Sequence, residues 1–521
     1  MVFSSLVFLG LFLPVILLLY HVTLRATGSL KAANKVVLAG SLFFYSWGEP
    51  LWICAMLFTA TVDFFNGRRM VTAKRRGGAK MVLASSLIIN LGILFVFKYL
   101  AFVTESLNGL TGLALPVFSV EMPIGISFYT FQSLSYVIDL YRGKARVQRR
   151  YFNYLLYVSM FPQLVAGPIV RYVDVEAQIM GRGMSFSTFA GGVRRFCVGM
   201  GKKVVLANTA GAAASALLDG SLTDLTVAGA WLGTLFFAFQ IYFDFSGYSD
   251  MAIGLGKMFG FRYKENFNYP YVSRSITEFW RRWHMSLSGF FRDYVYIPLG
   301  GNRNLQIRNI LVVWLLTGLW HGASWNFIGW GLYYGLLLLA EKYVGQFLAR
   351  RRALAEGRLA AGAEAGTEAE ATGALETTGG ASAEATPRVL AERARGGALA
   401  ALRWILTMLV VLYGWGIFYF TNSARLLHFT KVFFLLDRGA AFADMLAESV
   451  FFQYFWILPI LAVGSAPWLR DLARKMERAV RRGGAGAWLE ATEGILALAL
   501  LGLCFLLLVG GSYNPFLYFR F

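Results

Sequence analysis

The sequence contains few charged residues for its length. Asp, Glu, Lys and Arg make up 15% of its 521 residues, whereas a soluble globular protein carries about a quarter. Hydrophobic residues make up 57%, and apolar runs recur along the whole chain. This balance excludes an ordinary soluble enzyme. It predicts an all-α polytopic membrane protein, because each membrane-spanning helix needs about 20 mostly apolar residues.

Acidic residues are the scarcer of the two charge types. The 49 Lys and Arg residues against 29 Asp and Glu give a formal net charge of +20. On a soluble protein this excess would suggest nucleic-acid binding, but here the basic residues gather in short loops between apolar runs, as on the cytoplasmic side of membrane proteins. Residues 66–80, 142–150 and 470–484 are therefore expected to face the cytoplasm. Residues 104–121 lack Lys and Arg and are expected outside, and no nucleic-acid partner is expected.

Cysteine and histidine are also rare. Cys54, Cys197 and Cys504 lie far apart in apolar surroundings, without the spacing of a metal site or a disulfide framework. We expect buried, unreactive thiols. The chain has only four histidines, none in the helical zinc-binding pattern with a glutamate between paired histidines. Neither a metal nor a tightly bound cofactor is expected.

The apolar segments outline the transmembrane part. The first 20 residues lack the basic start and small-residue cleavage site of a signal peptide, which predicts a retained first transmembrane helix. Residues 122–141 and 161–170 are rich in Gly and Pro and are expected to form broken or re-entrant helices. Irregular backbone survives at membrane depth only where protein or a water-filled cavity satisfies it. The pattern therefore implies a cavity inside the helix bundle. Further apolar segments lie near 36–46, 50–65, 81–103, 187–218, 225–260, 307–321, 324–346, 401–421, 449–467 and 492–518.

Residues 347–400 differ in kind from the rest of the chain. They are rich in Ala, Glu, Gly and Thr and have almost no large apolar side chains, so they cannot bury enough surface to fold alone. We expect a disordered or loosely helical cytoplasmic loop, which separates a core of residues 1–346 from transmembrane helices in 401–521. A passive linker is the simpler interpretation, and a binding role is the alternative.

The stretch "TGLWHGASWNF" (317–327) sets His321 in one of the most apolar parts of the chain. A lone histidine in a span is usually a packed core residue, but titratable groups in membranes are costly and often functional. The segment 275–303, "SITEFWRRWHMSLSGFFRDYVYIPLGGNR", adds His284 among aromatic and basic residues. Two imidazoles at one cavity suit proton transfer near neutral pH.

The segment 275–303 reads as one amphipathic helix at the membrane interface or along a cavity. On a helical wheel its apolar side holds Trp280, Trp283, Leu287, Phe290 and Tyr294, and its polar side holds Glu278, Arg281, Arg282, Met285, Gly289 and Arg292. Arginine matches phosphate geometry, so Arg281, Arg282 and Arg292 are candidate ligands for a phosphorylated substrate. Their alternative role is anchoring to the cytoplasmic membrane surface.

Asp244 and Asp250 lie in the otherwise apolar segment 240–261. They could orient a catalytic group, line an ion path or hold neighbouring helices together by hydrogen bonds, and the residues leave these three roles open. The glycines of this segment do not follow a strand, so no nucleotide fingerprint is expected. The sequence "GASWN" lacks the second glycine of a nucleophile elbow, which argues against a serine hydrolase.

Several long motifs together resemble one family. They are "LFFYSWGEP" (42–50), "MPIGISFYTFQSLSYVIDLYRG" (122–143), "FPQLVAGPIVRY" (161–172), "YFDFSGYSDMAIGLGKMFGF" (242–261), "EFWRRWHMSLSGFFRDYVYIPLGGNR" (278–303) and "LLTGLWHGASWNFIGWGLYYG" (315–335). They are similar, in this order, to the bacterial alginate O-acetyltransferase branch of the membrane-bound O-acyltransferase superfamily. The resemblance runs from residue 1 to about 346 and continues more loosely over 401–521. The low-complexity residues 347–400 are not part of the family pattern.

The resemblance implies a ring of about eleven tilted transmembrane helices, with re-entrant and amphipathic helices, around a central tunnel. His321 matches the family's catalytic histidine, and His284 matches a second motif position that relatives fill with histidine or asparagine. The implied reaction moves an acetyl group from a cytosolic thioester, expected to be acetyl-CoA, across the bacterial inner membrane. The acceptor would be alginate or another extracytoplasmic polysaccharide, reached directly or through a secreted partner acetyltransferase. Candidate substrate-binding residues are Trp283, Trp320, Trp325, Asn326, Arg281, Arg282, Arg292 and Asp244.

Two other classes of protein compete with the enzyme. A transporter or flippase for an envelope glycan or lipid would use the cavity and the buried Asp244 and Asp250. Against it, the sequence has no matching pair of interrupted spans in two halves, as many transporters do. A non-catalytic scaffold for an extracellular enzyme would tolerate loss of His321.

Overall fold

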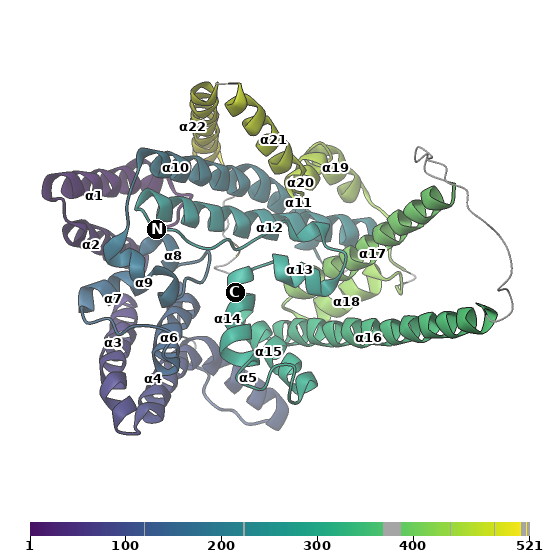
Figure 1. The fold of residues 1–521 in the computed structure, drawn as a ribbon, viewed down its shortest axis with the longest axis horizontal. Helices are drawn as coiled ribbons and strands as arrows, with labels where there is room; N and C mark the ends of the chain where they lie inside the picture. The colour runs from purple at the N-terminus through teal and green to yellow at the C-terminus, as the bar shows by residue number, and fades with distance from the viewer. Residues whose placement is uncertain are drawn as a thin grey trace.

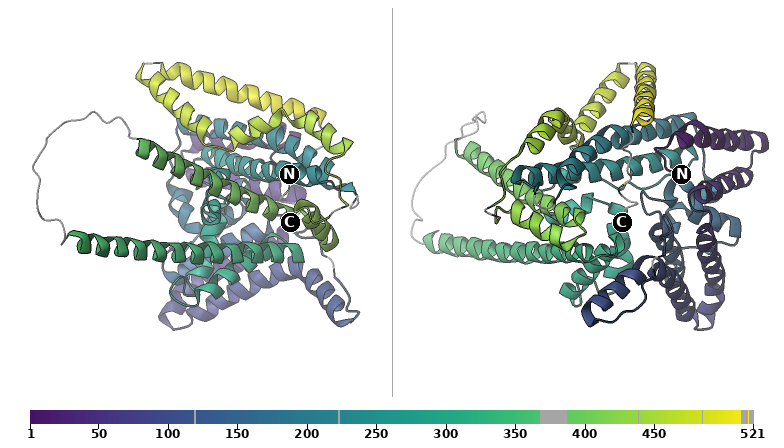
Figure 2. Two further views of the ribbon diagram at one scale, coloured as in Figure 1. Left: turned by 90° about the vertical axis from the view of Figure 1, so that its right-hand side faces the viewer. Right: turned by 180° about the vertical axis from the view of Figure 1, so that it is seen from behind.

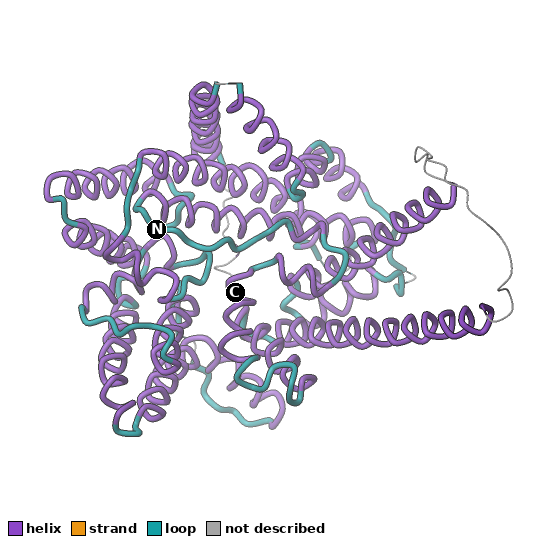
Figure 3. Tube along the Cα trace, in the orientation of Figure 1, coloured by secondary structure: helices purple, strands orange, loops and turns teal. Residues whose placement is uncertain are grey.

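The computed structural model describes residues 1–118, 120–221, 224–367, 387–437, 439–483, 485–511 and 517. Regular secondary structure in this part of the chain is helical, with no β-strand (Figure 3). Five helical stretches are long and apolar enough to cross a membrane, and a bent helix pair would bring the number to six. The prediction of an all-α multi-pass membrane protein is confirmed at this level. The ring of about eleven spans stays a prediction.

The N-terminal half of the chain forms both long and short helices (Figure 1). Its helices are η1 (Phe8–Phe12), α1 (Leu13–Thr27), α2 (Leu30–Gly48), α3 (Ile53–Arg75), α4 (Ala79–Leu94), η2 (Phe95–Tyr99), α5 (Leu100–Thr111), α6 (Ile126–Arg142), α7 (Tyr151–Ser159), α8 (Phe161–Leu164), α9 (Tyr172–Gly181), α10 (Phe186–Gly201), η3 (Lys202–Ala207), α11 (Asn208–Leu218) and α12 (Val227–Met258). The candidate spans here are Phe8–Thr27, Ala79–Thr111 and Val227–Met258.

The C-terminal half combines short helices with the two longest helices, α16 and α17. They are η5 (Pro270–Val272), α13 (Ile276–Arg282), α14 (Met285–Phe291), η6 (Arg292–Tyr296), α15 (Gln306–His321), α16 (Trp325–Thr367), α17 (Pro387–Tyr419), α18 (Ser423–Phe433), α19 (Met445–Tyr454), α20 (Ile457–Gly464), α21 (Trp468–Arg482) and α22 (Gly486–Gly510). The candidate spans are Gly397–Tyr419, Trp488–Gly510 and the pair α19–α20, which is bent by 63°. Short helices α13 and α14 lie in the middle of the molecule, between α12 and the pair α15–α16 (Figure 1).

The two predicted broken segments have different outcomes. Residues 161–170 form the four-residue helix α8 followed by buried irregular backbone, as expected. Residues 122–141, in contrast, are not broken, because α6 is continuous from Ile126 onward, and the alternative of a re-entrant helix stays a prediction. Gly125, directly before α6, allows this helix to lie close to the backbone of α8. It has φ +78°, and a Cβ there would lie 2.6 Å from the carbonyl oxygen of Leu164. Only glycine fits that position without displacing the broken segment.

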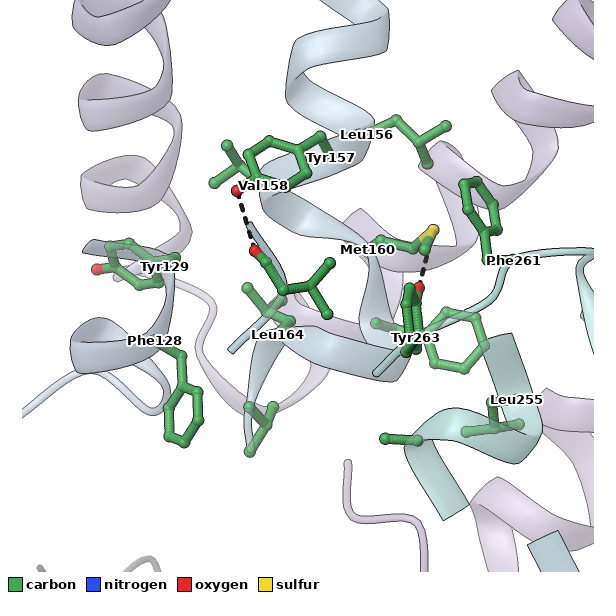
Figure 4. Close-up of a cluster of buried hydrophobic side chains, with 14 of the residues drawn as sticks. Phe128, Tyr129, Leu156, Tyr157, Val158, Met160, Leu164, Leu255, Phe261 and Tyr263 are labelled. Carbon is green, nitrogen blue, oxygen red and sulfur yellow. Dashed lines mark hydrogen bonds between the residues drawn. The ribbon is translucent and has the colours of Figure 1, made fainter. Parts of the chain in front are cut away.

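Two hydrophobic clusters form the core. The first joins the N-terminal helices with α6–α10, and Figure 4 shows part of it, including the hydrogen bond from the Tyr263 hydroxyl to the Met160 sulfur. The second joins α11, the first half of α12, α13 and α16–α20. Trp320 belongs to the first cluster and Trp283 and Trp330 to the second. The end of α15 therefore lies at the boundary between the two clusters.

The predicted loop 347–400 is helical at both of its described ends. Helix α16 continues past residue 346 to Thr367, and α17 begins at Pro387. Both helices project away from their neighbours (Figure 2). The predicted boundaries at 346 and 400 thus do not coincide with helix ends, residues 368–386 lie outside the described residues, and the division into domains stays a prediction.

The predicted burial is confirmed for two of the three thiols, and their lack of reactivity stays a prediction. Cys197 and Cys504 are buried, but Cys54 is exposed on α3. Apolar neighbours in the sequence did not indicate which face of the helix points outward. In a membrane protein such an outward face contacts lipid, so apolar surroundings in the sequence do not imply burial in the protein.

Candidate active site

A cavity of about 240 Å³ lies between α13, α14, α15 and α16. Its wall combines aromatic and aliphatic side chains with nearly as many polar and basic ones. Five residues singled out from the sequence line it: Arg281, Trp283, His284, Arg292 and His321. Both candidate histidines therefore line one cavity. Its lining residues do not come from 122–141 or 161–170, so the cavity predicted to satisfy the backbone of those segments stays a prediction.

His321 is the last residue of α15. The helix ends there because Gly322 turns to extended backbone, and the Phe327 ring fills the space where a larger residue at 322 would place its Cβ. The imidazole is 9% exposed and lines the cavity. Rings of Trp320, Trp330 and Phe418 meet it edge to face at centroid distances of 5.0, 5.1 and 5.2 Å. These contacts hold the ring in one orientation while leaving an edge toward the cavity.

Lys98 supports the end of α15. Its Nζ donates hydrogen bonds to the carbonyl oxygens of Trp320 at 2.5 Å and His321 at 3.4 Å. The adjacent Tyr99 hydroxyl donates to the carbonyl oxygen of Leu319 at 2.9 Å. The last carbonyls of a helix lack partners within it, and a cation there also compensates the helix dipole. Lys98 is not among the residues predicted from the sequence, although a lone lysine inside an apolar run could have indicated it.

Replacing Lys98 by methionine is expected to destabilise the protein by about 2 kcal/mol, because hydrogen bonds from a charged donor contribute about 1.5–3 kcal/mol. The measurement is thermal unfolding of the purified protein followed by tryptophan fluorescence. Lys80→Met is the matched control, since Lys80 is exposed near the start of the same span. Equal melting temperatures for the two variants would contradict the supporting role.

His284 lies at a break that the sequence did not predict. Residues 275–303 do not form one amphipathic helix; α13 ends at Arg282 and α14 begins at Met285. His284 has φ +43°, a left-handed conformation that is unfavourable for a residue with a side chain and is tolerated where surrounding structure enforces it. Its ring is 2% exposed and lies against Phe245 and Trp320 at 4.6 and 5.7 Å. The break turns His284 toward the same cavity as His321.

The three candidate arginines separate into two groups. Arg281 and Arg292 line the cavity. Arg282 instead forms an ion pair with Glu278 at 2.8 Å and donates to the carbonyl oxygen of Asn268. The break after α13 explains the separation, because it ends the helical periodicity on which the single polar face depended.

Asp293 holds the Arg292 side of the cavity. It accepts hydrogen bonds from Arg292 at 2.7 Å and Arg171 at 2.6 Å. Although partial burial alone would raise the pKa of Asp293, the hydrogen bonds from these two guanidinium groups lower it below its usual value. The Arg142 guanidinium also donates to the backbone carbonyl of Asp293 at 2.8 Å. This side of the cavity therefore adjoins the basic loop expected in the cytoplasm.

The remaining aromatic and amide candidates are spread around the cavity. Trp320 packs between the two imidazoles. Trp325 is 58% exposed and contacts Phe102, so it does not line the cavity. The Asn326 amide donates to the carbonyl oxygens at residues 417 and 418, near the end of α17. Its contact with the cavity is thus indirect, through the Phe418 ring beside His321.

The intramembrane carboxylates of α12 are held by basic residues. Asp244 pairs with Lys203 at 2.7 Å, both 3% exposed, and accepts a hydrogen bond from the backbone of Leu517. Asp250 pairs with Lys202 at 2.7 Å and Arg195 at 2.8 Å. These contacts tie α12 to α10 and η3, which favours the helix-holding role among the three predicted. Asp244 is not among the residues that line the cavity.

Among the described residues, no group of three or more His, Cys, Asp and Glu side chains is arranged to hold a metal ion. The cavity itself contains two imidazoles with neighbouring guanidinium groups. Imidazole transfers protons near neutral pH, and guanidinium binds phosphate or carboxylate. The site residues and their roles stay predictions at this stage.

Comparison with known proteins identifies the reaction class. The model of the MBOAT, membrane-bound O-acyltransferase family, matches residues 145–366, which include both histidines. The probable alginate O-acetylase AlgI of Azotobacter vinelandii is 44% identical over 350 residues, 66% of this chain and 69% of that protein. The protein of the same name from Pseudomonas aeruginosa is 39% identical over 426 residues, 80% of this chain and 72% of that protein.

A peptidoglycan O-acetyltransferase of Helicobacter pylori is 34% identical over 373 residues, 66% of this chain and 70% of that protein. All three relatives are named for acetyl transfer rather than for transport. The prediction of an enzyme, made against the transporter and scaffold alternatives, is confirmed. The chain belongs to the membrane-bound O-acyltransferase family, in its alginate O-acetylase-like branch, and is an O-acyltransferase.

Proposed function

We propose that the protein takes an acetyl group from cytosolic acetyl-CoA and delivers it through the bacterial inner membrane for O-acetylation of an extracytoplasmic polysaccharide. The observation that carries the proposal is the cavity shared by His284, His321, Arg281 and Arg292. Its arginine side adjoins Arg142, in the loop expected to face the cytoplasm. A cytosolic donor would therefore meet the basic residues first and the imidazoles further in.

In the proposed reaction His321 is the general base. The oxygen of an acceptor hydroxyl attacks the thioester carbonyl carbon while the His321 imidazole takes the hydroxyl proton. The tetrahedral intermediate then collapses, the carbon–sulfur bond breaks, and the leaving thiolate takes that proton back from the imidazolium. The products are an acetyl ester and the free thiol of CoA. General base catalysis contributes about 10²–10⁴-fold, and holding both reactants at the cavity contributes further.

The donor side of the proposal rests on Arg281 and Arg292. Their guanidinium groups would bind the phosphates of acetyl-CoA, which enters as a co-substrate rather than a resident cofactor. Trp283 lines the same cavity and would pack against the donor. His284 would position the donor or the acceptor beside His321.

The double substitution Arg281→Ala and Arg292→Ala is expected to raise the KM for acetyl-CoA by at least about 10-fold with little change in kcat, because each charged hydrogen bond contributes about 1.5–3 kcal/mol. Steady-state transfer at varied acetyl-CoA gives both constants. Arg303→Ala is the control, since Arg303 is an exposed arginine in the loop that follows η6. An unchanged KM in the double variant would assign these arginines to membrane anchoring instead.

The acceptor side is proposed from the names of the relatives, which act on alginate and on peptidoglycan. The acceptor is alginate or another envelope glycan, reached directly or through the hydroxyl of a secreted partner acetyltransferase. A partner hydroxyl would be acetylated first and would pass the acetyl group to the sugar in a second step. The chemistry at His321 is the same in both routes.

The test uses inside-out membrane vesicles that contain the protein and enclose an acceptor oligosaccharide. Labelled acetyl-CoA is added outside, where the cytoplasmic face points. We expect labelled acetyl esters inside the vesicles, either on the oligosaccharide or on an enclosed secreted partner. Label that never crosses in either arrangement, in vesicles with correctly inserted protein, would refute transfer from acetyl-CoA.

A further inference from the structure

Asn266 contacts His284 from the loop between α12 and η5. It is 1% exposed, and it is not one of the residues that line the cavity shared by the histidines. Its Oδ1 lies 3.1 Å from Nδ1 of His284 and accepts hydrogen bonds from the hydroxyl of Ser286 at 2.8 Å and its backbone N–H at 3.3 Å. Its Nδ2 donates to the Ser249 hydroxyl at 3.0 Å and the Gly167 carbonyl oxygen at 3.4 Å.

These neighbours fix which way the Asn266 amide points. An amide turned by 180° would place its NH₂ group against the backbone N–H of Ser286, so that two donors would face each other. It would also place its oxygen against the carbonyl oxygen of Gly167, so that two acceptors would face each other. The backbone groups cannot change their donor or acceptor character, and therefore the amide oxygen faces His284.

The amide oxygen in turn determines where the proton of His284 lies. A carbonyl oxygen only accepts hydrogen bonds, so an imidazole nitrogen 3.1 Å away must carry a hydrogen. The hydroxyl of Ser286 is 3.5 Å from the same nitrogen, but it donates its hydrogen to Oδ1 of Asn266 at the shorter distance of 2.8 Å. In the neutral imidazole a hydrogen on Nδ1 leaves Nε2 with a free lone pair.

We infer that Asn266 is a positioning residue that holds His284 in the tautomer with hydrogen on Nδ1, so that Nε2 serves the cavity as a hydrogen-bond acceptor. Within the described chain, Nε2 of His284 is buried and has no hydrogen-bond partner. The inference deepens the proposed function, on which it rests for the identity of the group that Nε2 meets. A histidine held by a second residue in one tautomer is a recurrent arrangement in catalysis.

This tautomer limits the groups with which His284 can form a hydrogen bond in the cavity. A neutral imidazole with a bare Nε2 cannot donate a hydrogen bond to the thioester carbonyl oxygen from that side. It can accept one from a hydroxyl or a thiol. His284 therefore acts on the hydroxyl that attacks or on the thiol that leaves, while the stabilisation of the carbonyl oxygen must come from other groups.

Asn266 also supports the backbone conformation of this turn. Its carbonyl oxygen accepts a hydrogen bond from the backbone N–H of Met285 at 2.9 Å. Ser286 also donates two hydrogen bonds to the Asn266 side chain. The two residues directly after His284 are therefore both bonded to Asn266. The left-handed conformation at His284 costs free energy, and these bonds offset it. One residue thus sets both the place of the imidazole and its tautomer.

The test is ¹⁵N NMR of the full-length protein in lipid bilayers, labelled on histidine. Only four histidines contribute signals, and His284→Asn identifies the pair from His284. Protonated and bare imidazole nitrogens resonate far apart, so the tautomer is read directly without substrate. We expect a protonated Nδ1 and a bare Nε2. A protonated Nε2 in the unmodified protein would overturn the inference.

Two substitutions separate positioning from folding. Asn266→Leu removes the acceptor and should lose the single tautomer, with kcat about 10²-fold lower and the KM for acetyl-CoA nearly unchanged. Asn266→Asp keeps an acceptor oxygen and should keep the Nδ1–H tautomer. Ser249→Ala is the control, because it removes a partner of Nδ2 only and should leave the His284 signals unchanged. A single unchanged tautomer in Asn266→Leu would refute the role of Asn266.

The outcomes also distinguish this inference from the proposed function. The NMR signals do not depend on any donor or acceptor. If the expected tautomer is observed but acetyl-CoA supports no transfer, the donor proposal fails and the positioning role stands. If transfer proceeds but His284 carries its hydrogen on Nε2, the positioning role of Asn266 fails and the donor proposal stands.

Discussion

Alanine at position 321 is expected to lower the rate of acetyl transfer by about 10³-fold, within the range that general base catalysis contributes. The variant keeps the cavity, the arginines and His284, but it lacks the imidazole that takes the proton of the acceptor hydroxyl in the proposed reaction. The measurement is transfer of labelled acetyl groups in membrane vesicles, normalised to the amount of inserted protein. The effect should appear in kcat, because in the proposed reaction the imidazole acts on the transition state rather than on binding of the donor.

The control for this variant is His428→Ala. His428 lies on α18, is partly exposed and faces Asp437 at 3.9 Å, so its loss leaves the cavity intact. It should transfer acetyl groups at the unmodified rate. A His321→Ala protein that folds, inserts and retains more than half of the activity would remove His321 from the mechanism. In cells, the same variant should export unmodified polymer normally, since in the proposed function the protein transfers acetyl groups and does not export the polymer.

The residues that could be predicted from the sequence are those whose chemistry contrasts with their surroundings. His321 is conspicuous as a titratable side chain between tryptophans, and His284 as a second one in a basic, aromatic segment. Both line the same cavity, together with Arg281 and Arg292. Membrane location and helical class followed from composition for the same reason, because burial in lipid leaves so few charged positions.

What could not be predicted depends on contacts between distant parts of the chain. Lys98 is 222 residues from the carbonyl that it supports, and Asn266 is 18 residues from His284, with η5 and α13 between them. The break at His284 overrides the periodicity of the segment, which placed Arg282 on the same face as Arg281. Periodicity describes a single helix, whereas the break exists because Asn266 and Ser286 stabilise a left-handed residue.

A second large loss of stability and activity is expected from glycine substitutions at the crossing of α15 and α16. This crossing carries His321 and the Trp330 ring beside it. The two helices approach so closely that a Cβ at Gly318 would overlap the carbonyl oxygen of Phe327 and lie 3.4 Å from Cα of Gly331. A Cβ at Gly331 would likewise overlap the carbonyl oxygen of Trp314. Small residues at such crossings let membrane helices pack backbone to backbone.

Gly318→Ala and Gly331→Ala are therefore each expected to destabilise the protein by about 3 kcal/mol, since the obstructing atoms belong to backbone and cannot rotate away. The separated helices would also move His321 relative to Trp330, and acetyl transfer should fall more than about 10-fold, because even about 1 Å of misplacement costs up to 10²-fold. Thermal unfolding and vesicle transfer measure the two effects on the same preparation.

Gly329→Ala, on the same helix, is the control and is expected to change stability in the opposite direction. Gly329 is exposed, and nothing lies within 4 Å of a Cβ built there. In a helix interior alanine is favoured over glycine by up to about 1 kcal/mol, so this variant should be slightly more stable and fully active. If Gly318→Ala and Gly331→Ala matched Gly329→Ala in both measurements, α15 and α16 would not be in backbone contact. The placement of His321 against Trp330 would then need another cause.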